Sequence, residues 1–300
     1  MNPALERIKY ILAVVLYGTI GLFLRFVGLP SEIAALFRGI LGSLFIYLFL
    51  RIRGRRPDRG AIRANRKWLL IGGAALGLNW IFLFAAYIKT TVAVASLCNY
   101  MAPLIVVLIA PAVLGERTDG RKLLCAAAAF VGIVLVSGVW KGSVGSVTGL
   151  VMGLLAAASF VVIVISNRKL KDISAYDRSV VQLAVSAATI LPYVLVQNVG
   201  KLLALDVRSV LIILMLGVVH TGIAYCLYFS GMGSLPVQAV AILGYLEPVV
   251  AVLCSAFFLH EAMDLAGWIG AALIIGAAVV SECLGEQKRP EGAAVSKKAR

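Results

Sequence analysis

The strongest constraint on this chain is a succession of apolar runs, each about 20 residues long, separated by short clusters of charged or helix-breaking residues. A helix rises about 1.5 Å per residue, so a run of this length matches roughly 30 Å of membrane hydrocarbon. Hydrophobic residues make up 61% of the chain and its mean hydropathy is +0.98, which excludes an ordinary water-soluble globule. The sequence therefore predicts an all-α integral membrane protein.

Ten of these runs are expected to form transmembrane helices. Their predicted limits are 9–27, 31–50, 68–88, 91–114, 121–139, 146–166, 178–197, 208–231, 235–259 and 263–284. A polar tail follows at 285–300. Its proline, glycine and basic residues predict a disordered cytoplasmic segment.

Lysine and arginine are distributed unequally between alternate loops. If the N-terminus lies inside, 22 of the 28 fall on the inner side, and only Arg38 lies within a span. Cytoplasmic loops carry an excess of basic residues, so we expect a protein of the bacterial inner membrane with both termini in the cytoplasm. The net charge of +14 does not indicate nucleic acid, because the basic residues lie between spans and not among aromatic residues on one surface.

The two halves of the sequence repeat each other. "NYMAPLIVVLIAPAVLGE" (99–116) aligns without a gap with "GYLEPVVAVLCSAFFLHE" (244–261), and the two segments share a Tyr, a Pro and a final Glu. Five spans per repeat is an odd number, so the second copy must enter the membrane from the opposite face. The sequence therefore predicts two inverted five-helix repeats, 1–140 and 141–284, an arrangement typical of carriers.

Several motifs carry a family resemblance: "YGTIGLFLRF" in the first span, "PSEIAALFRGILG" at the second, and the frames ending "LGE" and "LHE". With these motifs the chain resembles the drug/metabolite transporter superfamily, specifically its ten-span carriers with two EamA-type repeats. It departs from many relatives by having Tyr17 in place of Trp and by lacking a Glu-Pro pair in the first repeat. The resemblance implies movement of small metabolites, commonly export of amino acids and related or toxic compounds, often with proton exchange.

A carboxylate lies near the middle of the ninth span. Glu247 precedes Glu261, which closes that span, by 14 residues, or about 21 Å of helix. An ionised group at this depth costs at least about 2.5 kcal/mol, so it usually faces a cavity, has a partner or is protonated. Pro248 and, in the first repeat, Pro103 each remove a helical hydrogen bond. Two opposed, proline-interrupted helices point to a central binding site.

Other polar and aromatic residues are predicted at similar depth, and by depth they converge on one chamber. Arg38 is interpreted either as a structural anchor or as a substrate contact, and His220 either as a packing histidine or as a proton relay. Glu116 and Glu261 are interpreted as structural caps or gate contacts. Together with Glu247, the candidates are Tyr17, Arg38, Asn79, Trp80, Asn99, Tyr100, His220, Tyr225 and Tyr245.

These features predict a secondary active transporter that exports a small metabolite by alternating access, with proton coupling through Glu247 and His220. Arg38 facing a carboxylate and Glu247 an ammonium would suit an amino acid. The alternatives are an exporter of cationic amphiphiles and, from another class, a lipid flippase, scramblase or intramembrane enzyme. The sequence has neither a phosphate loop nor a metal-ligand spacing, so no enzyme activity, cofactor or metal is expected. The expected partners are the small-molecule substrate, protons and membrane lipid, and the sequence predicts no oligomeric state.

Overall fold

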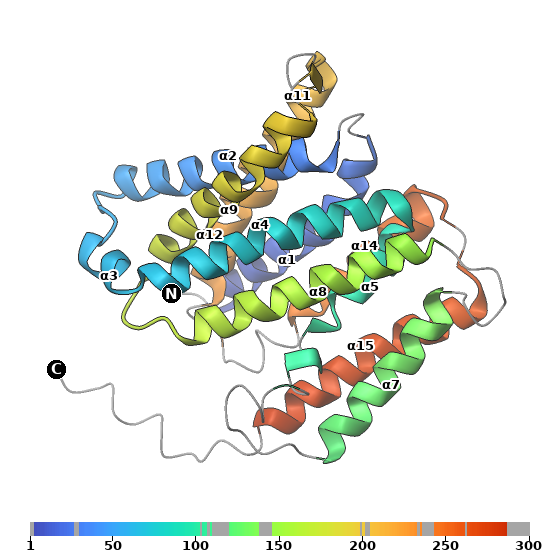
Figure 1. The fold of residues 1–300 in the computed structure, drawn as a ribbon. Helices are drawn as coiled ribbons and strands as arrows, with labels where there is room; N and C mark the ends of the chain where they lie inside the picture. Colours follow the sequence, from blue (N-terminus) through green and yellow to red (C-terminus); the bar gives the residue numbers. More distant parts are fainter. Residues whose placement is uncertain are drawn as a thin grey trace.

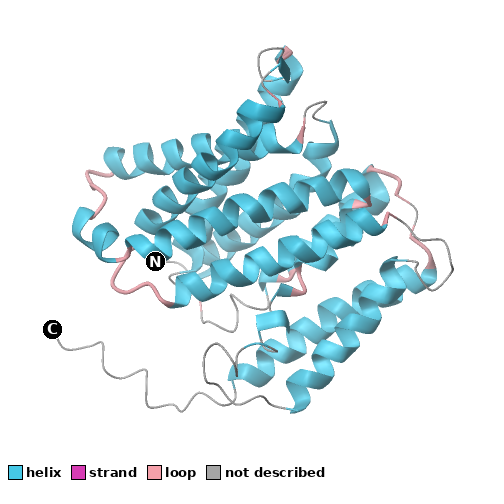
Figure 2. Cartoon of the chain, viewed as in Figure 1, coloured by secondary structure: helices cyan, strands magenta, loops and turns pink. Residues whose placement is uncertain are grey.

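The protein is helical throughout the part that the structure, a computed structural model, describes (Figure 2). The described residues are 3–26, 30–102, 104–106, 109, 120–137, 146–198, 200–201, 205–232, 235, 243–261 and 263–286. No β-strand occurs within these ranges. The all-helical part of the fold prediction is therefore confirmed, whereas the predicted tail, 285–300, lies almost wholly outside the described residues.

The N-terminal half contains long helices and one short helix that the sequence did not predict (Figure 1). The short helix, α3, begins after Asp58, whose carboxylate accepts a hydrogen bond from the amide of Ala61 at 3.0 Å. None of its residues is buried, so it forms part of the basic loop between two spans. The helices of this half are α1 (Pro3–Phe26), α2 (Ser31–Ile52), α3 (Arg59–Ala64), α4 (Arg66–Lys89), α5 (Val92–Asn99) and α7 (Gly120–Ser137).

The C-terminal half contains α8 (Val147–Arg168), α9 (Ala175–Gln197), α11 (Val207–Leu214), α12 (Ala224–Met232), α14 (Leu246–Leu253) and α15 (Leu265–Glu286). Two π-helical segments interrupt this half. The first, η2 (Met215–Ile223), joins α11 to α12, and the second, η3 (Cys254–Phe258), extends α14. Such segments are rare and frequently occur at functional sites, because the wider turn displaces side chains from their α-helical positions.

The described helices fall on the predicted spans. Six of them are long and apolar enough to cross a membrane, from α1, α2, α4, α8, α9 and the continuous α11–η2–α12. Shorter apolar helices occupy the fourth, fifth, ninth and tenth predicted spans. Residues 110–119, 138–145 and 236–242 flank these shorter helices and lie outside the described part of the chain. The exact number of ten spans therefore stays a prediction.

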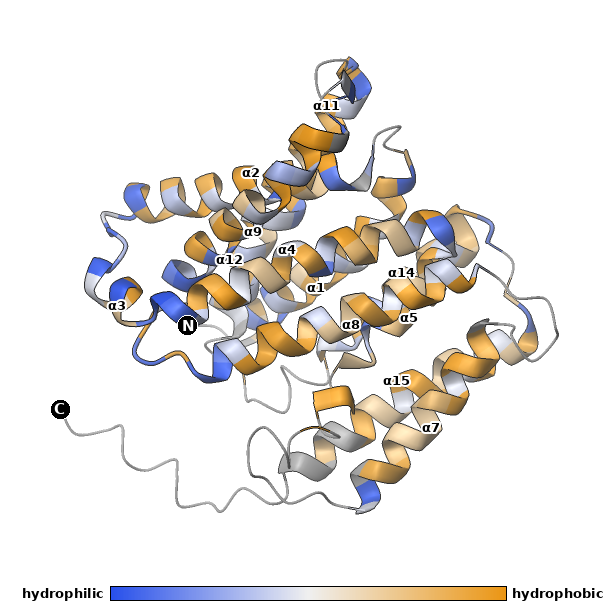
Figure 3. Cartoon of the chain, viewed as in Figure 1, coloured by the Kyte–Doolittle hydropathy of each residue, from blue (hydrophilic) through white to orange (hydrophobic). Residues whose placement is uncertain are grey.

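Two basic segments of the sequence meet at one end of the bundle. Asn65, which precedes α4, donates from Nδ2 to the carbonyl oxygen of Lys171 at 2.8 Å and accepts from its amide at 2.9 Å. Lys171 lies between α8 and α9, so this pair joins the loops of the two halves. Figure 3 shows hydrophilic residues gathered here, around α3 and the start of α4. The gathering agrees with the charge pattern, and the assignment of this end to the cytoplasm stays a prediction.

Hydrophobic residues make up most of the length of the long helices (Figure 3). Large apolar side chains on several helices are exposed, a pattern that would be unfavourable in water over so wide an area and that marks contact with lipid. Examples are Leu48 on α2, Leu124 and Phe130 on α7, Val196 on α9 and Leu265 on α15.

The helices pack in pairs that the two halves share. α4 packs against α8, and α1 packs against α12. By order along the chain, α1 corresponds to α8 and α4 corresponds to the helix α11–η2–α12. The two pairs are therefore the same pair of helices, seen once from each half. In the same way α4 packs on α9 and α2 on η2. Three further pairs, α2 with α9, α5 with α14 and α7 with α15, join a helix to its own counterpart. A two-fold relation between the two halves gives this pattern, whereas the five-helix unit, its inverted orientation and its boundaries stay predictions.

Helices α7 and α15 lie side by side and touch through their backbones (Figure 1). Gly132 and Gly270 face each other at this crossing. A Cβ added to Gly132 would lie 2.7 Å from the carbonyl oxygen of Gly270, and one added to Gly270 would lie 2.5 Å from that of Gly132. Small residues allow helices in lipid to approach this closely. Van der Waals contacts across the crossing then hold the two helices together, because lipid provides no hydrophobic driving force between helices.

We therefore expect Gly270→Ala to destabilise the protein although alanine favours helix formation more than glycine. The added methyl must push α7 away from α15, at a cost of about 1–3 kcal/mol. Gly276→Ala on the same helix is the matched control, because a Cβ there meets nothing within 4 Å. Thermal unfolding of the detergent-purified variants measures the difference, and equal midpoints for the two variants would contradict the proposed close contact.

Candidate functional site

Two helix interruptions occur at corresponding positions of the two halves. α5 ends at Asn99 and is followed by Tyr100, with φ −72° and ψ 0°, and α14 begins after Tyr245, with φ −73° and ψ −4°. The two rings lie against each other, with centroids 6.3 Å apart. Pro248 explains the second interruption, because its ring nitrogen cannot donate a helical hydrogen bond. Pro103, which predicts the first, lies outside the described residues.

Glu247 lies in the first turn of α14, directly beyond the interruption. The hydroxyl of Tyr100 donates a hydrogen bond to its carboxylate. Gly18 on α1 permits close packing here, because a Cβ at that position would lie 2.7 Å from the carbonyl oxygen of Glu247. Glu247 thus lies on α14 with its backbone against α1 and its carboxylate bonded to Tyr100, which follows α5.

Tyrosines surround Glu247 from several helices. Besides Tyr100, five lie close enough to interact electrostatically with its carboxylate: Tyr10, Tyr17, Tyr87, Tyr225 and Tyr228. We call these six tyrosines, Glu247 and Arg38 the Glu247 cluster. The side chains of Glu247, Tyr17, Tyr100 and Tyr225 are only partly buried although helices enclose them. The surrounding helices therefore do not seal the cluster completely.

Arg38 on α2 is the cationic member of this cluster. Its side chain is 3% exposed, and its Nε donates to the hydroxyl of Thr221 at 3.1 Å. The guanidinium carbon lies 4.4 Å from the ring centroid of Trp80 and 5.3 Å from that of Phe84, which places the charge over two aromatic faces. Arg38 interacts electrostatically with Glu247 but makes no ion pair with it among the described contacts. The two charged groups therefore lie near each other without a direct ion pair among the described contacts.

His220 lies on η2, and its two ring nitrogens have partners within the protein. Nε2 is 3.1 Å from the hydroxyl oxygen of Thr19, and Nδ1 is 3.4 Å from the carbonyl oxygen of Met215. The Thr19 hydroxyl also donates to the carbonyl oxygen of Leu16 at 2.8 Å. The carbonyl oxygen of Met215 can only accept, so Nδ1 is the donor in that contact, and in the neutral ring Nε2 is then the acceptor. The single hydroxyl proton of Thr19 therefore goes either to Nε2 or to Leu16, and not to both at once. These partners agree with a packing histidine, and the proton relay stays a hypothesis.

Asn79 joins three helices. Its Nδ2 donates to Oδ1 of Asn99 on α5 at 3.0 Å and to the carbonyl oxygen of Ala156 on α8 at 2.8 Å. Both amide hydrogens are thereby used, and the side chain is 3% exposed. Of the predicted site residues, Asn79 and Asn99 thus bond to each other, whereas Tyr17, Arg38, Tyr100, Tyr225 and Glu247 gather in the cluster.

Sequence reasoning missed Tyr10, Tyr87 and Tyr228. The ring centroids of Tyr10 and Tyr228 are 4.9 Å apart, and that of Tyr17 is 5.9 Å from that of Tyr228. A spacing signal was present, because Tyr10 lies seven residues before Tyr17 and Tyr228 three after Tyr225. Both intervals place a pair on one helix face.

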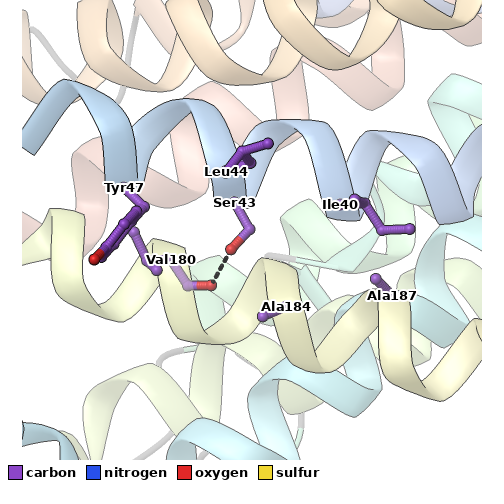
Figure 4. A pocket seen from close by; sticks show the side chains of 7 residues that line it. All are labelled: Ile40, Ser43, Leu44, Tyr47, Val180, Ala184 and Ala187. Atoms are coloured by element: carbon purple, nitrogen blue, oxygen red, sulfur yellow. Dashed lines mark hydrogen bonds between the residues drawn. The ribbon is translucent and has the colours of Figure 1, made fainter.

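An open groove of about 360 Å³ lies apart from this cluster, between α2 and α9 (Figure 4). Its one serine hydroxyl already donates to a carbonyl oxygen of α9, so the groove walls offer little polar recognition. A surface of this kind suits contact with lipid chains better than binding of a charged metabolite. The lining residues are Ile40, Ser43, Leu44, Tyr47, Val180, Ala184 and Ala187.

The sequence profile of the EamA-like transporter family matches this chain twice, at residues 8–138 and 147–282. The chain therefore belongs to the EamA-like transporter family, and it is an integral membrane protein of the transporter class. The family resemblance found in the sequence is confirmed.

Individual relatives agree with this assignment. An uncharacterized transporter of Archaeoglobus fulgidus is 30% identical over 273 residues, which cover 90% of this chain and 94% of that protein. The aromatic amino acid exporter YddG of Ancylobacter novellus is 28% identical over 72% of this chain and 76% of its own length. A solved crystal structure with 21% identity shares the fold, with a TM-score of 0.65 over 94% of this chain and 98% of that one.

We expect Asn79→Leu to lower the thermal unfolding midpoint of the purified protein. The change keeps a similar volume but leaves Oδ1 of Asn99 without its donor, and an unsatisfied buried polar group costs about 1–3 kcal/mol. Leu78→Ala is the control, because that neighbouring side chain is 42% exposed on the lipid-facing side. A midpoint no lower for Asn79→Leu than for Leu78→Ala would show that the Asn79 bonds do not stabilise the fold.

Proposed function

We propose that this protein is a secondary active transporter that exports an amino acid or a related amphipathic metabolite by alternating access. The observation that carries the proposal is the Glu247 cluster, in which a carboxylate and a guanidinium lie near each other beside partly exposed tyrosines, with no ion pair between the two among the described contacts. A zwitterion with an apolar side chain complements such a site in charge and in shape.

The guanidinium of Arg38 supports recognition of a carboxylate. Within the described residues its one hydrogen bond uses Nε, so the two terminal nitrogens keep four N–H donors. A buried guanidinium without acceptors is unfavourable, and a bidentate carboxylate is the group that fits its planar fork. Stacking on Trp80 fixes the plane of the fork before the substrate arrives.

Glu247 supports recognition of the ammonium group and coupling to protons. Its carboxylate has one hydrogen-bond donor in the cluster, Tyr100, and so retains acceptor capacity for an ammonium. Protonation would remove its charge and with it the attraction for the substrate. Competition between a proton and a cationic group for one carboxylate is a simple means of coupling their movements in opposite directions.

Aromatic side chains supply the apolar part of the site. The rings of Tyr17 and Tyr225 meet edge to face, with centroids 5.9 Å apart, and offer a surface for a substrate side chain. The relative YddG is named an aromatic amino acid exporter, which supports the same substrate class for this chain. The shared packing pairs of the two halves support alternating access, because two related units can rock about a site between them.

The tyrosines around Glu247 also favour a second candidate, an exporter of organic cations. Six phenol rings and one carboxylate form a site that could hold a cation without a carboxylate partner. The two candidates differ in their need for Arg38, because a simple cation has no group for the guanidinium to bind.

We expect Glu247→Gln to leave a folded protein in the membrane and to abolish the pH dependence of transport. The amide keeps the shape of the side chain but neither ionises nor exchanges a proton with the substrate. The measurement is substrate counterflow in proteoliposomes with and without a pH gradient. Asp172→Asn, which neutralises an exposed acid in the loop before α9, is the control. Wild-type response of Glu247→Gln to the gradient would exclude Glu247 as the coupling residue.

We expect Arg38→Gln to weaken binding of amino acids by about tenfold or more, because a charge-assisted bond to the carboxylate is lost. Binding of the corresponding amines, which lack that carboxylate, should change little. Ligand-induced thermal stabilisation of the purified protein compares the two series. Arg51→Gln, at an exposed position near the end of the same helix, is the control. Equal losses for amino acids and amines would contradict the assigned role and favour the cation exporter.

A further inference from the structure

A second group of polar contacts surrounds Glu261, at the end of the bundle opposite the basic loops. Its Oε1 accepts from Nη2 of Arg25, near the end of α1, at 2.5 Å. Its Oε2 accepts from the amide of Val92, the first residue of α5, at 2.9 Å and from the hydroxyl of Ser255 on η3. Arg25 Nη2 also donates to the carbonyl oxygen of Thr90 at 2.6 Å. One carboxylate thus joins helices from both halves of the chain.

The helices that Glu261 joins lead directly to the Glu247 cluster. α5 runs from Val92 to the interruption at Tyr100, and α14 with η3 runs from Glu247 back toward Glu261. The two short helices are joined at the cluster by the bond from Tyr100 to Glu247 and at their far ends by Glu261. α1 packs against α14 and η3, and α5 packs against α14, so these helices lie together beside the cluster.

The local backbone places Glu261 for this role. After η3, the amide of Leu259 donates to the carbonyl oxygen of Cys254 at 3.1 Å, and the amide of Glu261 donates to that of Ser255 at 3.0 Å. Between them His260 has φ +51°, a left-handed conformation that is disfavoured for residues other than glycine. The chain thereby turns back so that the carboxylate meets η3. Backbone strain of this kind is concentrated at switch regions and ligand clamps.

We infer that the contacts of Glu261 form a latch on the external path to the Glu247 cluster, and that separation of Arg25 from Glu261 opens this path during transport. The inference rests on the proposed function and on the orientation predicted from the basic loops. The side chains of Arg25 and Glu261 are 28% and 14% exposed, so water reaches the pair. When water reaches an ion pair, each charged group can exchange its partner for water at a modest cost in free energy. A contact that breaks in every transport cycle needs such a low cost.

Val92 provides a reporter of the latch. Its backbone amide bonds to Glu261, and its side chain lies against Gly21 of α1 and is 0% exposed. Separation of α1 from α5 would uncover this side chain, whereas the latched form protects it. A cysteine is smaller than valine and keeps the backbone amide, so Val92→Cys fits the same position.

The experiment uses Val92→Cys in a full-length chain whose five native cysteines are replaced by alanine, reconstituted in vesicles. A membrane-impermeant maleimide is added from each side in turn, and the modification rate is measured with Glu261, with Glu261→Gln and with Arg25→Gln. Arg208→Gln is the control, because it removes an exposed cation at the start of α11, at the same end of the bundle. No substrate is needed, so a failure of the substrate assignment leaves this test intact.

The latch predicts that Glu261→Gln and Arg25→Gln each raise the modification rate from the external side about tenfold, as loss of a charge-assisted bond implies. The double variant should exceed either single variant little, because both remove the same pair. Arg208→Gln should leave the rate unchanged. If one latch variant fails to fold, the other carries the test. Unchanged rates, an increase from the cytoplasmic side alone, or an equal increase with Arg208→Gln would overturn the latch.

Discussion

Hydrocarbon offers no hydrogen bonds, so every polar group within the membrane needs a partner inside the protein, and this requirement shapes the structure around Glu247. The interruption before α14 exposes backbone groups at the centre of the bundle, and Pro248 makes it permanent. Polar side chains from several helices collect there because the interior is the only place where they find partners. The Glu247 cluster is therefore a consequence of the interrupted helices. The long helices around it keep the two interruptions next to each other.

Near-symmetry between the two halves explains where the interruptions lie, and departures from it explain what each half contributes. Tyr100 and Tyr245 have nearly the same backbone conformation and lie ring against ring. Beyond this shared framework, the second half adds Glu247 where the first has Ala102. The first half adds Arg38, which reaches the second half through Thr221. Opposite charges thus enter the cluster from opposite halves, so movement between the halves changes their separation.

The apolar runs predicted the long helices well, because membrane thickness fixes helix length; α4, expected at 68–88, spans Arg66–Lys89. Local geometry was harder to predict. The run 91–114 gave no sign that α5 ends at Asn99 other than a proline four residues later. The π-helix η2 has no sequence signature, since any residue accommodates the wider turn. Tyr10 was missed because its place in the cluster depends on packing against α12, which no single span encodes.

Stability alone does not account for the separation of Arg38 from Glu247. A direct ion pair would satisfy both charges, and stability alone would favour it over two separate charges of which one, Arg38, is buried. Instead the guanidinium rests on Trp80 and Thr221 while the carboxylate rests on Tyr100. Within the described part of the chain, each charge is held by neutral partners that leave donors on the Arg38 terminal nitrogens and acceptor capacity on Glu247. A ligand with both signs of charge would complete the two sets of contacts at once, which is the physical reason for the substrate class that we propose.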